Sequence, residues 1–225
     1  IQPLRRSGPG NGDAVQICPT AGCGGGCAAA LLKRTVNGLS ERSILKIRNS
    51  TESDRTAIEA IHLSAFGERE GQEIVELVNG LLDDETAKPL LSLVAETDGK
   101  LAGHILFTVA RLQTGHEDAS IRILAPLAVS GDFQGKGVGG ALIKEGLKQL
   151  AESGVDLVFV LGHPDYYPKF GFRTAGLLGF EATYPIPSQH ADAWMVRELQ
   201  AGVIGKYEGR VQCAEVLNQP RYWRE

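Results

Sequence analysis

The sequence predicts an α+β fold built around one long mixed sheet. Two early segments repeat apolar residues at three- and four-residue steps, which is the period of amphipathic helices. An Asp98-Gly99 pair between two apolar runs is typical of a β-hairpin turn. Val155 to Leu161 is a nearly continuous apolar run, as expected of a strand buried on both faces. Along the chain the elements follow the order β-α-α-β-β-β-α-β-α-β-β, with no internal repeat or second domain boundary.

The first half of the globular part contains a strand, two helices and a hairpin. Asn49 to Asp54 has the spacing of a capping box, so a helix is expected to start directly after it. The periodic residues of that helix stop at Gly67, and a second periodic segment follows. The predicted elements are a strand over 45–48, helices marked by Ile58, Ile61, His62, Ala65 and Phe66 and by Ile74, Leu77, Val78, Leu81 and Leu82, and strands over 90–96 and 100–112.

The second half alternates strands with helical segments. Pro126 removes one hydrogen-bond donor from the strand predicted over Ile121 to Val129, so that strand should be irregular there. A helix containing Ala141 to Glu152 follows it. The remaining predicted elements are a buried strand over 155–161, a tight helical turn within 163–172, and strands over 172–175, 193–198 and 210–214.

A glycine-rich turn joins the strand that ends at Val129 to this helix. The turn carries glycines at positions 135, 137, 139 and 140. The first turn of a helix has unpaired N–H groups and the positive end of the helix dipole, and glycines let an anion approach that backbone closely. The turn therefore predicts a site for a phosphate-bearing cofactor.

Two common phosphate-binding motifs match this turn poorly. Gly135-x-Gly137-x-x-Gly140 has the letters of the dinucleotide fingerprint. That fingerprint needs its first glycine directly after the strand and an acidic residue at the end of the next strand. Here Ser130 to Gln134 intervene, and Asp156 lies at the wrong end of the next strand. A Walker A loop also fails, because Lys136 is followed by glycine and not by serine or threonine.

Three segments resemble the GNAT superfamily of N-acetyltransferases. Gln134-x-x-Gly137-x-Gly139 resembles its acetyl-CoA motif, Q/R-x-x-G-x-G/A. Tyr167 to Phe172 resembles its Y-x-x-x-G-F segment, and Arg48 to Asp54 resembles its opening strand-to-helix turn. The string from Gly162 to Phe172 is similar to that of the YhbS-like subgroup of predicted bacterial acetyltransferases. The resemblance implies a single GNAT-like (acyl-CoA N-acyltransferase) domain over 45–225, whose central mixed, mostly antiparallel sheet is flanked by helices.

The resemblance also implies an activity and a donor site. The protein would be an N-acetyltransferase that moves the acetyl group of acetyl-CoA, its co-substrate, directly to a primary amine of a small molecule or protein, without a metal. The pyrophosphate would bind the glycine-rich turn and the pantetheine arm would pair with the strand before it. The Tyr167 phenol would meet the CoA sulfur and protonate the departing thiolate. The implied cofactor-binding residues are Leu127, Ala128, Val129, Gln134, Gly135, Lys136, Gly137, Val138, Gly139, Gly140 and Tyr167.

The base that deprotonates the acceptor is less well defined. An alkylamine with a pKa of ~10.4 is almost fully protonated at pH 7, so a base or a water relay must take its proton. Many relatives carry a glutamate on the strand before the glycine turn, but this chain has Ile123-Leu-Ala-Pro126 there. His163 is the candidate base, since imidazole titrates near neutrality, and a surface or N-capping role is its alternative reading. His104 has a weaker claim.

An alternative to an enzyme remains open at this stage. Without a visible acidic base, the chain would also fit a catalytically silent acyl-CoA-binding regulatory module.

Three glutamates near the junction of the two helices are expected to form a solvated face, although this region lines the acceptor site in relatives: Glu68, Glu70 and Glu73.

Composition and charge limit the partners. The formal net charge is −4 and no run of basic residues occurs, which argues against nucleic acid. No segment approaches the ~18 apolar residues that span a bilayer. We expect a cytoplasmic protein that is a monomer or homodimer.

Residues 1–44 differ in composition from the rest. No Phe, Tyr or Trp occurs before Ser43, so this segment is expected to be a disordered or spurious extension. Its cysteines, Cys18, Cys23 and Cys27, lack the spacing and the fourth ligand of a zinc site. Because the single methionine is Met195, we expect Leu45 to be the natural start, read from a non-AUG codon.

Overall fold

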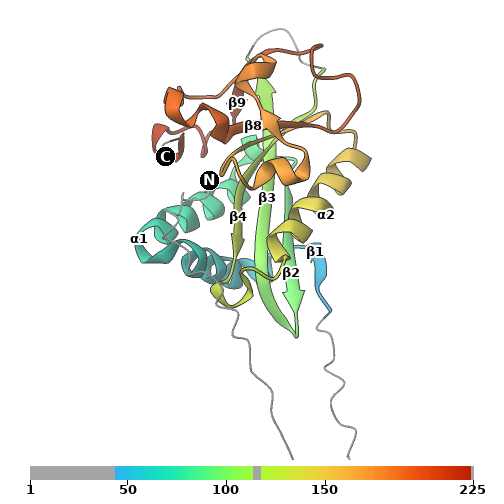
Figure 1. Cartoon of the computed structure of the whole chain (residues 1–225). Coiled ribbons are helices and arrows are strands. Elements are labelled where there is room, and N and C mark those ends of the chain that lie inside the picture. Colours follow the sequence, from blue (N-terminus) through green and yellow to red (C-terminus); the bar gives the residue numbers. More distant parts are fainter. Residues whose placement is uncertain (1–43, 114–117, 224–225) are drawn as a thin grey trace, which may run out of the picture. The chain divides into compact units, whose positions relative to one another are not determined.

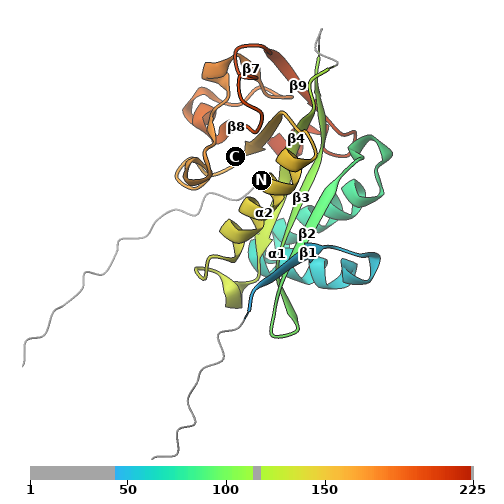
Figure 2. The same cartoon turned by 90° about the vertical axis from the view of Figure 1, so that its right-hand side faces the viewer.

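The computed structural model describes residues 44–113 and 118–223. Within these residues the strands form one nine-stranded sheet with the order β1-β2-β3-β4-β5-β8-β6, and β9 pairs with β3 and β7 beside this path. Helix α1 covers one face of the sheet and α2 the other (Figures 1 and 2). Only β4–β5 and β7–β9 are parallel among the named pairs of these residues, so the predicted mixed, mostly antiparallel sheet is confirmed. The predicted N-terminal extension and its three cysteines lie outside the described residues.

The first strand and helix are joined by the predicted capping box. Strand β1 (Lys46–Asn49) leads into a short 3-10 turn, and the Asp54 carboxylate accepts the Thr51 N–H at 2.8 Å. The Arg48 guanidinium donates to the same carboxylate at 2.7 and 2.9 Å. This ion pair lowers the pKa of Asp54, mainly through the Arg48 hydrogen bond.

Helix α1 (Arg55–Asp83) is two helical segments joined at a kink. Gly67 has φ 79° and ψ 174° there, a backbone conformation that residues other than glycine rarely adopt. The two predicted helices are therefore present, and they form one bent element that buries its apolar face on the sheet.

The centre of the sheet is a long meander. Strands β2 (Leu91–Thr97) and β3 (Lys100–Leu112) are joined by Asp98 and Gly99, whose φ angles of 51° and 72° suit a tight hairpin turn. Strand β4 (Ile121–Val129) pairs with β3, but the register shifts between Ile105 and Phe107, opposite the segment that contains Pro126. The irregularity predicted at Pro126 is thus a bulge.

Strands β4 and β5 separate after a short parallel stretch. Strand β5 (Leu157–Leu161) pairs with β4 only from Ile121↔Leu157 to Leu124↔Val160. The later part of β4, residues 125–129, has no partner in β5, and beyond the bulge its residues 127–129 stay paired with β3. We call this opening between the two strands the β4–β5 splay.

Helix α2 (Val138–Glu152) packs closely against β3. A methyl group added at Gly146 would lie 2.4 Å from the buried ring of Phe107. Because that distance is shorter than any real carbon contact, the glycine is what lets the helix approach the strand.

The C-terminal region extends the sheet and covers part of the α1 face. The order of elements is β6 (Arg173–Thr174), β7 (Phe180–Glu181), β8 (Trp194–Glu198) and β9 (Gly209–Cys213). β6, β8 and β9 correspond to predicted strands, whereas the two-residue β7 was not predicted. Trp194 and Trp223 pack edge to face at 5.7 Å in the core on the α1 side.

Candidate functional site

The glycine-rich turn is an exposed loop that ends in the first turn of α2. Gly135 and Gly137 have φ 73° and 82°, so both need the left-handed region that glycine adopts without strain. The first bond of the helix runs from the Ala141 N–H to the Gly137 carbonyl at 3.0 Å. The N–H groups before Ala141 therefore have no acceptor within the helix, and they lie where the dipole is positive. This is the geometry of an anion site.

The side chain of Gln134 fastens the loop to the sheet. Its amide donates to the carbonyl of Val129 at 3.0 Å. The Lys136 ammonium lies 5.5 Å from the centroid of the Phe133 ring. The loop thus carries a positive charge beside the free N–H groups.

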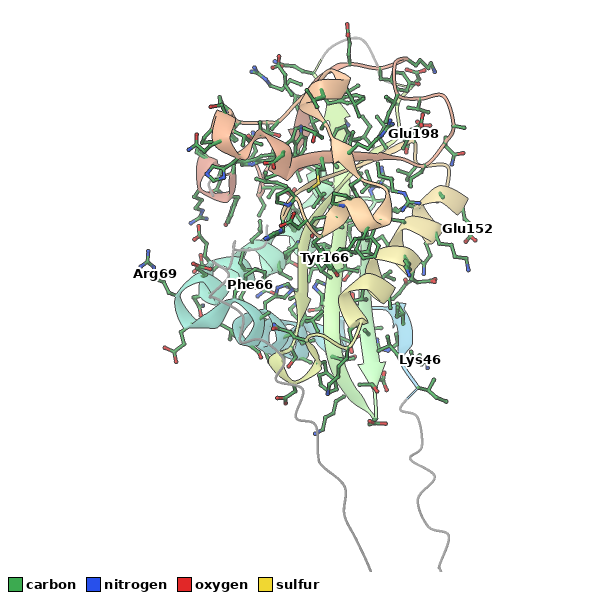
Figure 3. The ribbon with its side chains drawn as sticks, in the orientation of Figure 1. Lys46, Phe66, Arg69, Glu152, Tyr166 and Glu198 are labelled. Atoms are coloured by element: carbon green, nitrogen blue, oxygen red, sulfur yellow. The ribbon has the colours of Figure 1, made fainter. Side chains whose placement is uncertain are left out.

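The last two glycines of the turn, Gly139 and Gly140, leave room for side chains of the protein interior. A methyl group at Gly139 would lie 2.9 Å from the Tyr166 hydroxyl and 3.4 Å from Val129, and one at Gly140 would lie 3.3 Å from Phe170. At position 139 the missing side chain therefore makes room for these interior side chains and not for an anion. Gly139 and Gly140 instead let an aromatic turn dock on the start of α2, and Tyr166 in Figure 3 belongs to that turn.

The two adjacent tyrosines pack in the same core on the α2 face of the sheet but make different contacts. The Tyr167 ring packs against Gly162, the residue directly after β5, where an added methyl group would lie 2.4 Å from it. Tyr167 is only 1% exposed, and burial raises its pKa. The half-buried Tyr166 directs its hydroxyl toward Gly139 in the first turn of α2. Sequence reasoning missed Tyr166, since the family segment begins at Tyr167.

The His163 side chain accepts a backbone hydrogen bond within its own turn. Its Nδ1 accepts the backbone N–H of Asp165 at 3.2 Å, and the Asp165 carboxylate is 3.8 Å away. A ring that uses Nδ1 as an acceptor carries its proton on Nε2 and has no second lone pair. The geometry therefore favours the capping reading, and a role for His163 as base stays a prediction.

His104 is fully buried beneath α1 and hydrogen-bonded to a second buried histidine. The distance from His104 Nδ1 to His62 Nε2 is 2.9 Å. Desolvation lowers the pKa of His104 to about 3 and that of His62 well below its usual value, so both rings are neutral near pH 7. Of the glutamates expected on a solvated face, Glu68 and Glu70 are exposed, and Glu73 lies 3.8 Å from Arg221.

A small apolar pocket lies where β4 and β5 separate, on the α1 face of the sheet. Its cavity volume is about 10 Å³, which is room for a single water and too little for an amine substrate. Much of its wall comes from the C-terminal region, which sequence reasoning did not connect with a site. The lining residues are Ile123, Leu124, Ala125, Leu161, Trp194, Leu217, Tyr222 and Trp223.

The described part of the chain holds neither a metal-ligand cluster nor a membrane-spanning helix. Over 44–113 and 118–223, no group of three or more His, Cys, Asp or Glu is arranged to hold a metal ion. Among the same residues, no helix is long and apolar enough to cross a membrane.

A splayed pair of parallel strands lies next to a glycine-rich helix start, which can bind the phosphates of a nucleotide cofactor, and comparison with known proteins identifies the class. Residues 46–175 match the family described as "Acetyltransferase (GNAT) domain". The chain therefore belongs to the GNAT acetyltransferase family, and acetyl-CoA is its co-substrate. The family, the fold and the donor that the motifs predicted are confirmed.

Individual relatives support the same subgroup. The chain is 44% identical to the uncharacterized N-acetyltransferase YjhQ of Escherichia coli K12 over 165 residues, which cover 73% of this chain and 89% of YjhQ. The crystal structure of E. coli YhbS in complex with CoA matches with a TM-score of 0.72 and 28% identity, over 81% of this chain and 97% of YhbS. A GNAT acetyltransferase from Brucella melitensis, in complex with acetyl-CoA, matches with a TM-score of 0.61 and 27% identity, over 78% and 99% of the two chains.

Proposed function

We propose that this protein transfers the acetyl group of acetyl-CoA directly to a primary amine of a small molecule or of a protein, with the reaction centred in the β4–β5 splay. The observation that carries the proposal is the unpaired edge of β4 at residues 125–129, directly before the glycine-rich turn. An extended pantetheine arm of acetyl-CoA, paired with this edge, would reach from the glycine-rich turn to the splay. In YhbS and in the Brucella protein the solved complexes contain CoA and acetyl-CoA.

In this proposal one set of residues binds acetyl-CoA and another protonates the leaving thiolate. The N–H groups of the turn, from Gly135 to Gly140, bind the pyrophosphate, and the backbone of Leu127 to Val129 pairs with the pantetheine arm. Acetyl-CoA supplies the thioester carbonyl that the amine attacks. Tyr167, on the β5 side of the splay, donates its phenolic proton to the departing thiolate. Burial raises the pKa of this phenol, so it is protonated when the thiolate forms.

The activity is tested by the release of free CoA thiol. Purified protein with acetyl-CoA should release thiol only when an amine is added, from a panel of a diaminoalkane, spermidine, an aminoglycoside and a lysine-containing peptide. A negative net charge mildly favours cationic acceptors of this kind. Acetyl-CoA binding with no thiol release across the panel would instead support a silent acyl-CoA-binding module. The cytoplasmic location and a monomeric or homodimeric state stay predictions.

Replacement of Gly137 by valine should weaken acetyl-CoA binding at least about tenfold. A β-branched residue at φ 82° is strained by roughly 1–3 kcal/mol, and its side chain projects into open space on the anion side of the loop. Isothermal titration with acetyl-CoA measures the change.

Gly154→Val is the matched control for this variant. Gly154 has φ 79°, has no atom near its added methyl group, and lies just beyond the opposite end of α2. The control should lose similar stability but keep its affinity. Equal affinity of the Gly137 variant and the wild type would remove the turn from the donor site.

A further inference from the structure

A chain of hydrogen bonds runs from the surface to a buried nitrogen beneath α1. The Ser50 hydroxyl donates to Ser92 Oγ at 2.6 Å, Ser92 Oγ lies 2.9 Å from His104 Nε2, and His104 Nδ1 lies 2.9 Å from His62 Nε2. Ser50 is half-buried, Ser92 is 7% exposed, and both histidines are 0% exposed. The chain therefore crosses from partly accessible to fully dry surroundings.

The inner end of this chain has an unused hydrogen-bonding atom. His62 Nδ1 is buried and has no hydrogen-bond partner among the described residues. A buried polar atom without a partner costs about 1–3 kcal/mol, and most such atoms in proteins are satisfied. An unsatisfied nitrogen at the end of an otherwise complete chain points to a group that binds there during function.

The histidines lie next to the part of β4 that the proposed function assigns to the donor. His104 is directly opposite Ala128 in the β3–β4 pairing, and cross-strand partners share a face of the sheet. On the same helix as His62, the Ser64 hydroxyl accepts the N–H of Gly131, two residues after β4 ends. Phe66, on the α1 side in Figure 3, stacks on His62 at 6.0 Å. The small pocket at the splay lies on this same α1 face.

Both rings are suited to passing protons without keeping them. Burial disfavours the charged form of each ring, so a proton that enters the pair is driven out at the other end. Asp54, held by Arg48, is the charged group whose field acts on His104, and it raises the pKa of that ring slightly against the effect of burial. The pair thus stays neutral between transfers.

We propose that His62, His104, Ser92 and Ser50 form the path by which the proton of the acceptor ammonium leaves the active site. This inference rests on the proposed function. It assigns the deprotonation step to residues that the family motifs do not mark.

The acceptor ammonium loses its proton along this path, and the acetyl group then moves to the freed amine. The ammonium gives one proton to His62 Nδ1, the Nε2 proton of His62 moves to His104 Nδ1, and the Nε2 proton of His104 moves to Ser92 Oγ. The Ser92 and Ser50 hydroxyls rotate outward, so that Ser92 gives its own proton to Ser50 and Ser50 gives one to water. This last proton reaches water only after the C–N bond has formed. The freed nitrogen lone pair forms the C–N bond and the C–S bond breaks. The sulfur takes the Tyr167 proton, and Tyr167 recovers a proton from the new amide nitrogen. After product release, water in the emptied site takes the Nδ1 proton of His62 while water at Ser50 returns one, which restores both tautomers.

The experiment is a pH–rate profile of His104→Gln with the best amine of the panel. Glutamine keeps a donor and an acceptor for Ser92 and His62, but its amide does not relay protons. At pH 7 we expect kcat/KM for the amine to fall about 100-fold, while the KM for acetyl-CoA stays within about twofold. Because only free amine can then react, kcat/KM should rise about tenfold per pH unit from pH 7 to 9, whereas the wild-type profile should be flatter because its path still holds the proton when the C–N bond forms. A merely structural defect would lower the rate by the same factor at every pH.

Two further variants keep the result interpretable. Ser92→Ala breaks the path outside the histidine pair and should give the same pH signature. Thr108→Val removes a fully buried hydroxyl on the same face of β3 that has no hydrogen-bond partner within the described ranges, and it should leave the profile unchanged. Wild-type rates in His104→Gln, or a loss that does not vary with pH, would overturn the path alone. Absence of turnover in the wild type with every amine would overturn the proposed function and the path together.

Discussion

Lowering the pH from 7 to 4.5 should reduce the free energy of unfolding by about 2.5 kcal/mol through the buried His104, and further through its buried partner His62. Burial lowers the pKa of His104 to about 3 and that of His62 in the same direction, whereas an unfolded histidine titrates near ~6.5. The unfolded state therefore binds more protons as the pH falls below 6.5. Each such histidine stabilises the fold fully above that pH and loses about 1.4 kcal/mol per pH unit below it, down to the folded pKa.

Urea unfolding at a series of pH values measures this loss. His104→Gln should be less stable at pH 7 but should show a flatter slope between pH 6.5 and 4.5. The ion pair of Asp54 with Arg48 does not interfere in this window. Because the pKa of Asp54 is lowered in the folded state, its stabilising effect is lost only as the pH falls below the unfolded-state pKa of ~4. A wild-type free energy that stays constant from pH 7 to 4.5 would contradict a buried neutral pair.

Elements specified by local chemistry were predictable from the sequence. The Asp98-Gly99 turn requires positive φ at both residues, and the hairpin follows from it. Gly67 likewise separated two helical periods, because the kink residue must leave the helical region. The glycine-rich turn could be found because its backbone has positive φ at Gly135 and Gly137, which requires glycine.

The parts that depend on tertiary packing were not predictable. His62 fitted the apolar face of a helix and His104 fitted a strand, and nothing local marks a contact between residues 42 positions apart. Their partnership exists only because α1 lies over β3. Tyr166 was missed for a similar reason, since its hydroxyl reaches the start of α2 only when the following turn docks on Gly139 and Gly140. The one available signal was an uncommon one, a histidine on each of two otherwise apolar faces.

Replacement of Tyr167 by phenylalanine should lower kcat for acetyl transfer by about 100-fold or more, with acetyl-CoA affinity within about threefold of the wild type. The phenol lies at the end of β5, where the strands have separated, and its ring is held by Gly162 and Phe172. Phenylalanine keeps that packing and removes only the proton donor, and general acid catalysis contributes typically 10²–10⁴-fold. Steady-state rates of thiol release, together with titration of acetyl-CoA, separate turnover from binding.

Tyr166→Phe is the matched control, because it removes the same hydroxyl from the adjacent residue. Tyr166 lies against the first turn of α2, so loss of its hydroxyl should change acetyl-CoA affinity more than kcat. The contrast between the two variants assigns the proton donor, since the two residues are adjacent and chemically identical and differ in their contacts, Tyr167 with Gly162 and Tyr166 with Gly139. The reverse pattern, with kcat lost in Tyr166→Phe and kept in Tyr167→Phe, would move the general acid to Tyr166. In that case the thiolate leaves toward α2, and the family position of the tyrosine serves packing in this chain.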